Sequence, residues 1–325
     1  MSAILVTGAA GFIGYHVCKR LLSRGERVIG VDNMNEYYEP SLKQARLEDL
    51  RGQTGFSFHR LDAAVPGAVA GLMRDADVRS VVHLAAQAGV RYSIDHPFEC
   101  ERSNFAAHLA VLEACRAAGK LEHLVYASSS SVYGERPAAG DKFREDESVD
   151  KPVSPYAATK RACELMSTTY GILYGLRQTG LRFFTVYGPY GRPDMAYFLF
   201  TRKLFSGEAI EVYGEGKLRR DFTYIDDAVD GLIAVLDRPP EPGENRILNL
   251  GNSKPEKLLD FIDIIERATG KKANIIFRPM SPGDVTATWA DISRIGALVG
   301  FQPKVEISEG LPRFVDWYRT RYPLA

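Results

Sequence analysis

The sequence predicts an α/β fold in which a doubly wound parallel sheet carries a smaller mixed α/β cap. Three observations predict it. Short apolar runs alternate with amphipathic stretches through the first half of the chain. A glycine-rich turn follows the first of these runs. The alternation stops after Gly188, where Pro189, Gly191 and Pro193 interrupt it.

The predicted strands are near-continuous apolar runs, as expected for parallel strands that helices cover on both faces. They span residues 4–8, 27–32, 56–62, 80–86, 124–129 and 181–187. After the first strand, Ile13, Val17 and Leu21 recur every fourth residue, which is typical of a helix with one buried face. Residues 104–118 and 156–174 are also expected to be helical.

The two predicted domains follow from this change of pattern. Residues 1–188 are expected to form the main domain, and residues 189–325 most of the cap. Residues 246–251 are predicted to return to the main sheet as a further strand. Because open α/β sheets bind ligands beyond the carboxyl ends of their strands, the cap is expected to close over that edge. The polar stretch 134–151 is predicted to be a surface loop.

The composition excludes several classes of function. Lys and Arg total 41, as do Asp and Glu, so the net charge of zero favours neither nucleic acid nor an anionic membrane as a partner. The six histidines fall at no metal-ligand spacing, so no metal site is expected.

Location is predicted from the cysteines and the apolar runs. The cysteines are widely spaced, without a C-x-x-C pair, and are expected to be buried free thiols of a reducing compartment. They are Cys18, Cys100, Cys115 and Cys163. With no targeting segment recognised and no apolar run near twenty residues, a cytoplasmic protein that does not span a membrane is expected.

The turn after the first strand has the pattern of a dinucleotide site. Residues 7–14 are T-G-A-A-G-F-I-G, and a helix is expected to follow. Gly8, Gly11 and Gly14 permit a tight turn, close approach of a pyrophosphate and close packing of helix on strand. Phe12 and Ile13 open the helix, whose free N–H groups would meet the pyrophosphate.

Polar and small residues at the ends of the next strands complete the predicted cofactor site. Asp32 ends the second strand, where a carboxylate accepts hydrogen bonds from the adenosine ribose and repels a 2′-phosphate. NAD is therefore favoured over NADP. The ends of the third and fourth strands supply further cofactor-binding candidates. These are Asp62, Ala63, Leu84, Ala85, Ala86 and Gln87.

The segment 154–160, S-P-Y-A-A-T-K, predicts a catalytic pair at the start of a helix. Ser154 is a good N-cap and Pro155 suits the first helical position. Tyr156 and Lys160 then lie one turn apart on the same face, where the ammonium stabilises a phenolate. Upstream, the serines 128–131 end a strand, and their hydroxyls can hydrogen-bond a reacting oxygen of a substrate.

Together these motifs resemble the extended short-chain dehydrogenase/reductases, the family of NAD-dependent sugar-nucleotide epimerases and dehydratases with a Rossmann-like fold. The similarity spans essentially the whole chain, and includes S-S-V-Y-G at 130–134 and R-R-D-F-T-Y-I-D-D at 219–227. It implies that Tyr156 is the base and acid at the sugar hydroxyl. It also implies that Lys160 binds the nicotinamide ribose and that Ser129 is the hydroxyl partner. Members often form homodimers by packing two helices from each subunit, here those around 104–118 and 156–174.

Within that family the chain is similar to UDP-glucuronate 4-epimerases over residues 31–38, 87–93, 182–189 and 191–195. The resemblance implies a UDP-sugar substrate and a 4-keto intermediate. It places Thr185 and Arg192 at the C5 substituent, where a guanidinium suits a carboxylate. Further implied substrate contacts are Arg91, Ser129 and Ser130, with Tyr213 at the uracil, Arg220 at the diphosphate and Asp284 at the uridine ribose. Asn33, Asn35 and Lys43 would line the adenosine end of the cofactor.

Three positions separate this interpretation from sister reactions. The 4,6-dehydratases carry an Asp and a Glu where this chain has Ser130 and Ser131, and decarboxylases carry Glu at the position of Ser131. UDP-galactose 4-epimerases typically carry Asn at the position of Thr185. A decarboxylase, a UDP-glucose/UDP-galactose 4-epimerase and a non-catalytic NAD-binding protein remain the alternatives.

Overall fold

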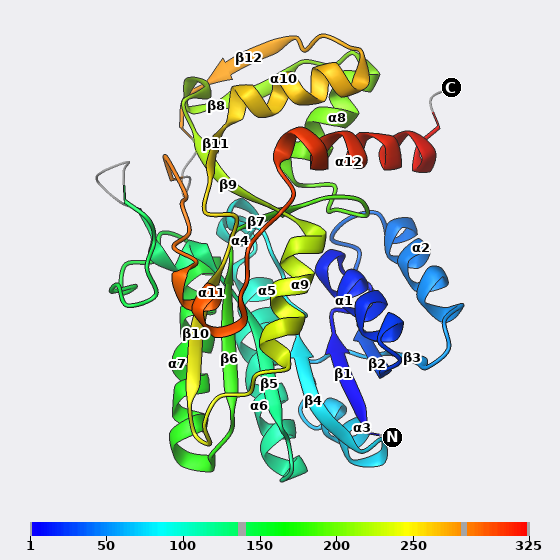
Figure 1. The fold of residues 1–325 in the computed structure, drawn as a ribbon, viewed down its shortest axis with the longest axis vertical. Helices are drawn as coiled ribbons and strands as arrows, with labels where there is room; N and C mark the ends of the chain where they lie inside the picture. The colour runs from blue at the N-terminus through cyan, green and yellow to red at the C-terminus, as the bar shows by residue number, and fades with distance from the viewer. Residues whose placement is uncertain (1, 136–140, 281–284, 324–325) are drawn as a thin grey trace.

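The computed structural model describes residues 2–135, 141–280 and 285–323, and within these ranges seven parallel strands form the main sheet. Their spatial order is β10-β6-β5-β4-β1-β2-β3 (Figure 1). The strands are β1 Ala3–Thr7, β2 Arg27–Asp32, β3 Phe56–Arg60, β4 Val78–His83, β5 His123–Ser129, β6 Gln178–Phe183 and β10 Asn245–Leu250. The order reverses between β1 and β4, and open α/β sheets bind ligands in a crevice beyond the strand ends at such a point.

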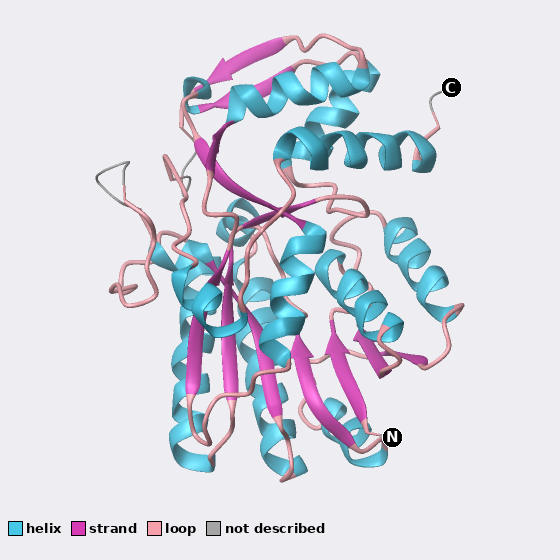
Figure 2. Ribbon diagram, in the orientation of Figure 1, coloured by secondary structure: helices cyan, strands magenta, loops and turns pink. Residues whose placement is uncertain are grey.

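Helices cover both faces of this sheet (Figures 1 and 2). One face carries α1, α2, α9 and α11, and the other α3, α4, α5, α6 and α7. Their bounds are α1 Phe12–Ser23, α2 Pro40–Arg51, α3 Ala68–Asp75, α4 Val90–Asp95, α5 Pro97–Glu101, α6 Ala107–Ala118, α7 Pro155–Tyr174, α9 Ile225–Leu236 and α11 Ser293–Val299. The predicted doubly wound α/β sheet is confirmed.

A smaller mixed α/β unit stands over the carboxyl ends of the strands (Figure 1). In it, β7, β9 and β11 form one small sheet and β8 pairs with β12 in another. Its elements are β7 Thr185–Tyr187, α8 Ala196–Ser206, β8 Ile210–Tyr213, β9 Arg219–Tyr224, β11 Pro255–Lys257, α10 Leu258–Thr269, β12 Ile275–Arg278 and α12 Ile307–Arg321. Between β9 and β11 the chain returns to the main sheet as α9 and β10, the strand expected over 246–251.

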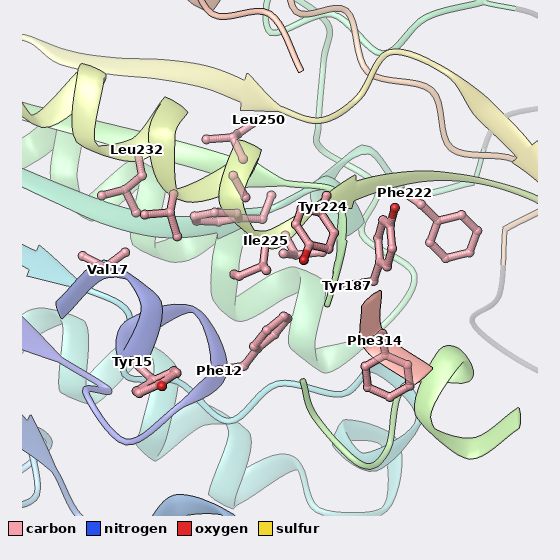
Figure 3. Close-up of a cluster of buried hydrophobic side chains, with 14 of the residues drawn as sticks. Phe12, Tyr15, Val17, Tyr187, Phe222, Tyr224, Ile225, Leu232, Leu250 and Phe314 are labelled. Carbon is pink, nitrogen blue, oxygen red and sulfur yellow. The ribbon is translucent and has the colours of Figure 1, made fainter. Parts of the chain in front are cut away.

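One continuous hydrophobic cluster joins the main sheet to this cap (Figure 3). Phe12 of α1 and Ile225 of α9 belong to it together with Tyr187 of β7 and Phe314 of α12. Each of these side chains is at most 5% exposed. Because apolar area is removed from water on both sides of the junction, the cap is held against the sheet by the same burial that stabilises the sheet.

Three predicted strands end two or more residues away from the prediction. The third and fourth end at Arg60 and His83 rather than at 62 and 86, so their polar tips lie in loops. The stretch 181–187 is divided at Phe184: β6 pairs with β5 and β10, whereas β7 has crossed into the cap and pairs with β9. Apolar runs alone do not reveal where a strand changes partners, which is why the sequence predicted one strand.

The predicted surface loop 134–151 is confirmed for most of its described part, residues 134–135 and 141–151, which form no helix or strand and are mostly exposed, but a few of its side chains are buried. Phe143 is 4% exposed and forms a β-bridge with Ala290. The side chain of Glu145 is also buried, where it accepts a hydrogen bond from the backbone N–H of Asn249. Val149 is buried in the same small cluster as Phe143. The segment is therefore held by contacts with Ala290 and with Asn249 of β10, although its composition is polar.

The four cysteines are buried and unpaired, as expected, and each lies in a helix. Over the part of the chain that is described, no helix has the length and apolar character needed to cross a bilayer.

Candidate functional site

The turn between β1 and α1 is closely packed around its glycines. Gly8 has a φ of +74°, and a Cβ there would lie 2.8 Å from the backbone nitrogen of Ala85. A Cβ on Gly14 would lie only 2.0 Å from the carbonyl oxygen of Gly8. The N–H of Gly11 donates to the same carbonyl over 2.9 Å. The turn is therefore held in a shape that side chains would prevent, at a helix N-terminus suited to a phosphate group.

The carboxylate of Asp32 supports this turn from the neighbouring strand. Its Oδ2 accepts from the N–H of Ala10 over 3.1 Å, and its Oδ1 accepts from the N–H of Met34 over 2.8 Å. Asp32 is 8% exposed at the end of β2. The predicted proximity of carboxylate and glycine turn is therefore present, in the arrangement that a dinucleotide ribose requires.

The loop after β2 brings together the predicted adenosine-end residues. The N–H of Asn35 donates to Oδ1 of Asn33 over 3.1 Å, and Lys43 Nζ donates to the Asn35 carbonyl over 2.8 Å. Burial lowers the pKa of the Lys43 ammonium, although the negative charge of Asp32 opposes this. A buried cation so placed suits a phosphate or a ribose hydroxyl.

The ends of β3 and β4 close the crevice on the other side. The N–H of Ala85 donates to Oγ1 of Thr7, and Leu84 to the Thr7 carbonyl. Gln87 is buried after Ala86, as is Ala63 after β3. The neighbouring Asp62 forms an ion pair with Arg102, with 2.6 Å between Asp62 Oδ2 and Arg102 Nη2. The glycine cradle, Asp32 and these residues at the ends of β3 and β4 together fit a bound NAD.

Helix α7 begins as the sequence predicted. Ser154 is its N-cap, with Oγ accepting from the N–H of Ala157 over 3.2 Å, and Pro155 occupies the first turn. Lys160 is 4% exposed, and its Nζ donates to the carbonyl of Ala127 over 2.8 Å. The same Nζ lies 6.0 Å from the centroid of the Tyr156 ring. The ammonium is thus fixed between β5 and the phenol.

Ser129 ends β5 and caps the short 3-10 turn Ser130–Tyr133. Its Oγ accepts from the N–H of Ser131 over 3.2 Å. Ser128 has the opposite environment: its hydroxyl donates to Glu164 Oε1 over 2.6 Å. Successive side chains of a strand point to opposite faces. Ser128 therefore joins a buried network with Glu164, whereas Ser129 caps the turn at the end of the strand.

That network includes an ion pair next to the predicted catalytic segment. Glu164 accepts from Arg182 Nε over 2.8 Å and from Arg182 Nη2 over 2.9 Å. Both side chains are almost fully buried, at 1% and 3% exposed. Glu164 lies one turn after Lys160 on α7, and Arg182 lies on β6, so the pair ties the helix to the sheet.

Two positioning residues were not predicted. Asn104 donates to Thr159 Oγ1 over 3.0 Å, and it also exchanges hydrogen bonds with the backbone of Gln87. Ser93 accepts from the backbone N–H of Tyr156 over 3.1 Å. They link the loop after β4 to the start of α7. A lone Asn and a lone Ser carry no sequence pattern that identifies them.

The loop after β7 brings Arg192 to the crevice, and Thr185 begins β7. Arg192 is paired with Asp194, and its charge also interacts with Tyr37 and with Tyr156. Although burial opposes it, these neighbours raise the pKa of the guanidinium, so Arg192 is a cation. The sequence-predicted cation is thus within electrostatic reach of the sequence-predicted phenol.

The remaining predicted substrate residues lie on the cap side. The guanidinium of Arg91 stacks over the ring of Tyr213, 4.4 Å from its centroid, and so spans from α4 to β8. Arg220 lies on β9, where its Nη1 donates to the Arg219 carbonyl over 3.0 Å. Asp284 lies outside the described residues. Among the residues that are described, no group of three or more His, Cys, Asp or Glu side chains could bind a metal ion.

Comparison with known proteins agrees with this geometry. Residues 4–251 match the model of the NAD dependent epimerase/dehydratase family. An uncharacterised protein of Methanocaldococcus jannaschii is 49% identical over 97% of this chain and 95% of its own length. The UDP-glucuronate 4-epimerase of Thermodesulfobacterium geofontis is 43% identical over 100% of this chain and 98% of its own.

Among solved structures, the UDP-glucuronic acid 4-epimerase of Bacillus cereus in complex with UDP-glucuronic acid and NAD superposes with a TM-score of 0.92. The two chains are 35% identical, and the match covers 98% of this chain and 100% of that one. Because the family model spans well over half of the sequence, the chain belongs to the NAD dependent epimerase/dehydratase family.

Proposed function

We propose that the chain is an isomerase that interconverts UDP-glucuronate and UDP-galacturonate by NAD-dependent epimerisation at C4. The observation that carries the proposal is the cationic guanidinium of Arg192, whose charge is within electrostatic reach of the phenol of Tyr156. A cation there gives the C6 carboxylate of a uronate a partner while C4 reacts at the phenol. The curated and structural relatives named as UDP-glucuronate 4-epimerases support the same substrate.

In this proposal residues 1–188 with the return strand hold the cofactor, and most of residues 189–325 close over the sugar nucleotide. The turn at Gly8, Gly11 and Gly14, with Phe12 and Ile13, would receive the NAD diphosphate, and Asp32 the adenosine ribose. When bound, the nicotinamide accepts the C4 hydrogen with its two electrons and later returns it.

Tyr156 takes the proton of the 4-hydroxyl as the 4-keto sugar forms, and returns it when the sugar is reduced. Lys160 holds a positive charge near the phenol and would hydrogen-bond the nicotinamide ribose of a bound NAD, while Ser129 would hydrogen-bond the reacting oxygen. Because the proton and the C4 hydrogen both return within one cycle, the reaction consumes no NAD.

Inversion requires the keto sugar to present its other face. In the proposal Arg220, Tyr213 and Asp284 retain the UDP while the hexose turns about its diphosphate link. Arg91 and Ser130 line the path of the ring. Arg192 and Thr185 hold the carboxylate near the plane of the C4 carbonyl, which slows loss of CO₂ from this β-keto acid.

A homodimer through the two helices expected for it, α6 and α7, is also proposed, with α5 packed against the same helix α7. Phe98 on α5 is 87% exposed, and Ile172 on α7 is 76% exposed, with Leu165 and Leu173 beside it. Large apolar side chains gathered on adjacent helices are typical of an interface. A cytoplasmic location remains part of the proposal.

The test is incubation of the purified protein with UDP-glucuronate, followed by proton NMR of the anomeric signals. UDP-galacturonate without release of CO₂, and without accumulating NADH, is the expected result. UDP-xylose as the main product would instead establish a decarboxylase. Turnover of UDP-glucose to UDP-galactose with none of the uronate would establish a neutral-hexose epimerase.

A further inference from the structure

The side chain of Arg192 is held by a carboxylate of its own loop. Asp194 accepts from Arg192 Nε through Oδ1 over 3.0 Å and from Nη2 through Oδ2 over 2.5 Å. This bidentate fork forms between residues two positions apart. The side chains are 22% and 31% exposed, so both are largely withdrawn from water.

A tyrosine from the cofactor side of the crevice completes the arrangement. Tyr37 donates from its hydroxyl to Asp194 Oδ2 over 3.1 Å. Its ring packs edge-on against Tyr92, with the centroids 4.7 Å apart. Gly89 makes room for it, because a Cβ on Gly89 would lie 2.8 Å from the Tyr37 hydroxyl. The orientation of Asp194 is therefore set from outside its own loop.

The loop itself is fixed relative to the cofactor turn. Arg46, which is fully buried, donates from Nη1 to the Ala10 carbonyl over 2.8 Å and from Nη2 to the Tyr190 carbonyl over 2.6 Å. Arg46 and Tyr37 thus connect the cofactor-binding segments to the loop of Arg192 by separate routes.

Asp194 uses only one of the two pairs of donors that the Arg192 guanidinium offers to carboxylates. A planar guanidinium offers two forks, one through Nε with one terminal nitrogen and one through the two terminal nitrogens. Asp194 occupies the first. None of the residues that the structure describes hydrogen-bonds to Arg192 Nη1, so the second fork is the one that a further carboxylate would use.

The pKa of the Asp194 carboxyl is consistent with an ion pair between Asp194 and Arg192 that persists at neutral pH. Burial on its own would raise the pKa of the Asp194 carboxyl, but the charge and hydrogen bonds of Arg192 and Tyr37 outweigh it and leave the pKa below its ordinary value. Asp194 is therefore ionised at neutral pH. A fixed negative charge beside Arg192 lowers its attraction for any anion, so its benefit must be orientation rather than charge.

We infer that Asp194 and Tyr37 are positioning residues that orient the second fork of Arg192 toward the C6 carboxylate of the sugar, and so determine selectivity for uronates. The inference rests on the proposed function. It assigns these residues a further role in product fidelity. If the carboxylate leaves the carbonyl plane of the 4-keto sugar, the C5–C6 bond breaks, CO₂ departs, and the electron pair forms an enolate that takes a proton at C5.

The experiment compares Asp194→Asn and Tyr37→Phe with the wild-type protein on UDP-glucuronate. Asparagine keeps the shape but removes the charge and presents a donor to one Arg192 nitrogen. We expect KM for UDP-glucuronate to rise on the order of tenfold, as for loss of one oriented charge-assisted hydrogen bond. A larger fraction of turnovers should release CO₂, detected by NMR as pentose products. Bound NAD and the melting temperature should change little in Tyr37→Phe.

The chain provides a matched control in Arg144 and Asp146. They form the same two-residue fork, with Nε–Oδ1 and Nη2–Oδ2 distances of 3.1 and 3.0 Å, but on the exposed surface. Asp146→Asn should leave both KM and the fraction of CO₂ released at wild-type values.

The outcomes separate the inference from the proposed function. A wild-type protein without activity on UDP-glucuronate refutes the proposed function and the inference with it. If the wild type epimerises the uronate but Asp194→Asn and Tyr37→Phe keep its KM and release no more CO₂, the inference alone is wrong. A lower KM in Asp194→Asn would also overturn it, because Asp194 would then be a competitor for Arg192. If Asp194→Asn does not fold, Tyr37→Phe decides the question.

Discussion

Removing the charge of Glu164 should be among the most damaging single changes outside the crevice. The Glu164 carboxylate is 1% exposed and accepts from Ser128, from two nitrogens of Arg182 and from Arg161 Nη1 over 3.1 Å. In Glu164→Gln an NH₂ group replaces one carboxylate oxygen, so a hydrogen-bond donor faces the donors of the guanidinium. The positive charge of Arg182 is then left buried without a counter-charge.

The magnitude follows from that unpaired charge. Breaking a buried pair by removing one partner costs about 3–5 kcal/mol, whereas replacing both partners by apolar residues is often near neutral. We therefore expect Glu164→Gln to lose about 3–5 kcal/mol of unfolding free energy, a large share of the total for a protein domain. The double variant Glu164→Leu/Arg182→Met should be more stable than Glu164→Gln.

The assay is urea denaturation followed by circular dichroism, with kcat measured on the folded variants. Asp263→Asn provides the control, because its pair with Arg267 is exposed on α10 and should contribute little. Loss of less than about 1 kcal/mol in Glu164→Gln would refute the argument from an unpaired buried charge. A double variant no more stable than the single one would refute it equally.

Three further predictions concern the cofactor turn, the phenol and acid stability. Gly14→Ala should abolish NAD binding, because its Cβ would meet the Gly8 carbonyl oxygen at 2.0 Å; the bound cofactor is quantified after purification, and retention at wild-type levels would contradict it. Tyr156→Phe should abolish turnover and retain NAD, which kinetics and cofactor quantification test together. Burial lowers the pKa of His123 from 6.5 to about 4, despite its hydrogen bond with the Leu236 carbonyl. The unfolded chain then binds the extra proton first, so stability is full above pH 6.5 and is lost as the pH falls toward 4. His123→Gln should reduce the slope of unfolding free energy in that window by about 1.4 kcal/mol per pH unit; an unchanged slope would show that the neutral buried imidazole is not its source.

The parts of the site that could be predicted are those encoded within a few residues. The glycine turn, the carboxylate at the end of β2 and the N-cap of α7 each depend on local backbone geometry. The Tyr156–Lys160 spacing is set by the helical period. Such features leave a pattern in the sequence, because the residues that need one another are neighbours in it.

The parts that could not be predicted involve residues far apart in the chain. Phe143 and the side chain of Glu145 are buried through contacts with residues more than 100 positions later, 289–291 for Phe143 and Asn249 for Glu145, which their polar surroundings in the sequence do not indicate. The division of the stretch 181–187 depends on where β9 lies, since pairing with β9 is what makes β7 part of the cap.

By itself, therefore, the sequence determined the doubly wound sheet and the local geometry of the glycine turn and of the Tyr156–Lys160 pair. Only the tertiary structure decided how Arg192 is oriented. Its loop is held through Tyr37, 157 residues from Asp194, and through Arg46, 144 residues from Tyr190. Helical period and glycine conformations act between near neighbours, whereas these contacts exist only after packing has brought the cofactor side and the cap side together.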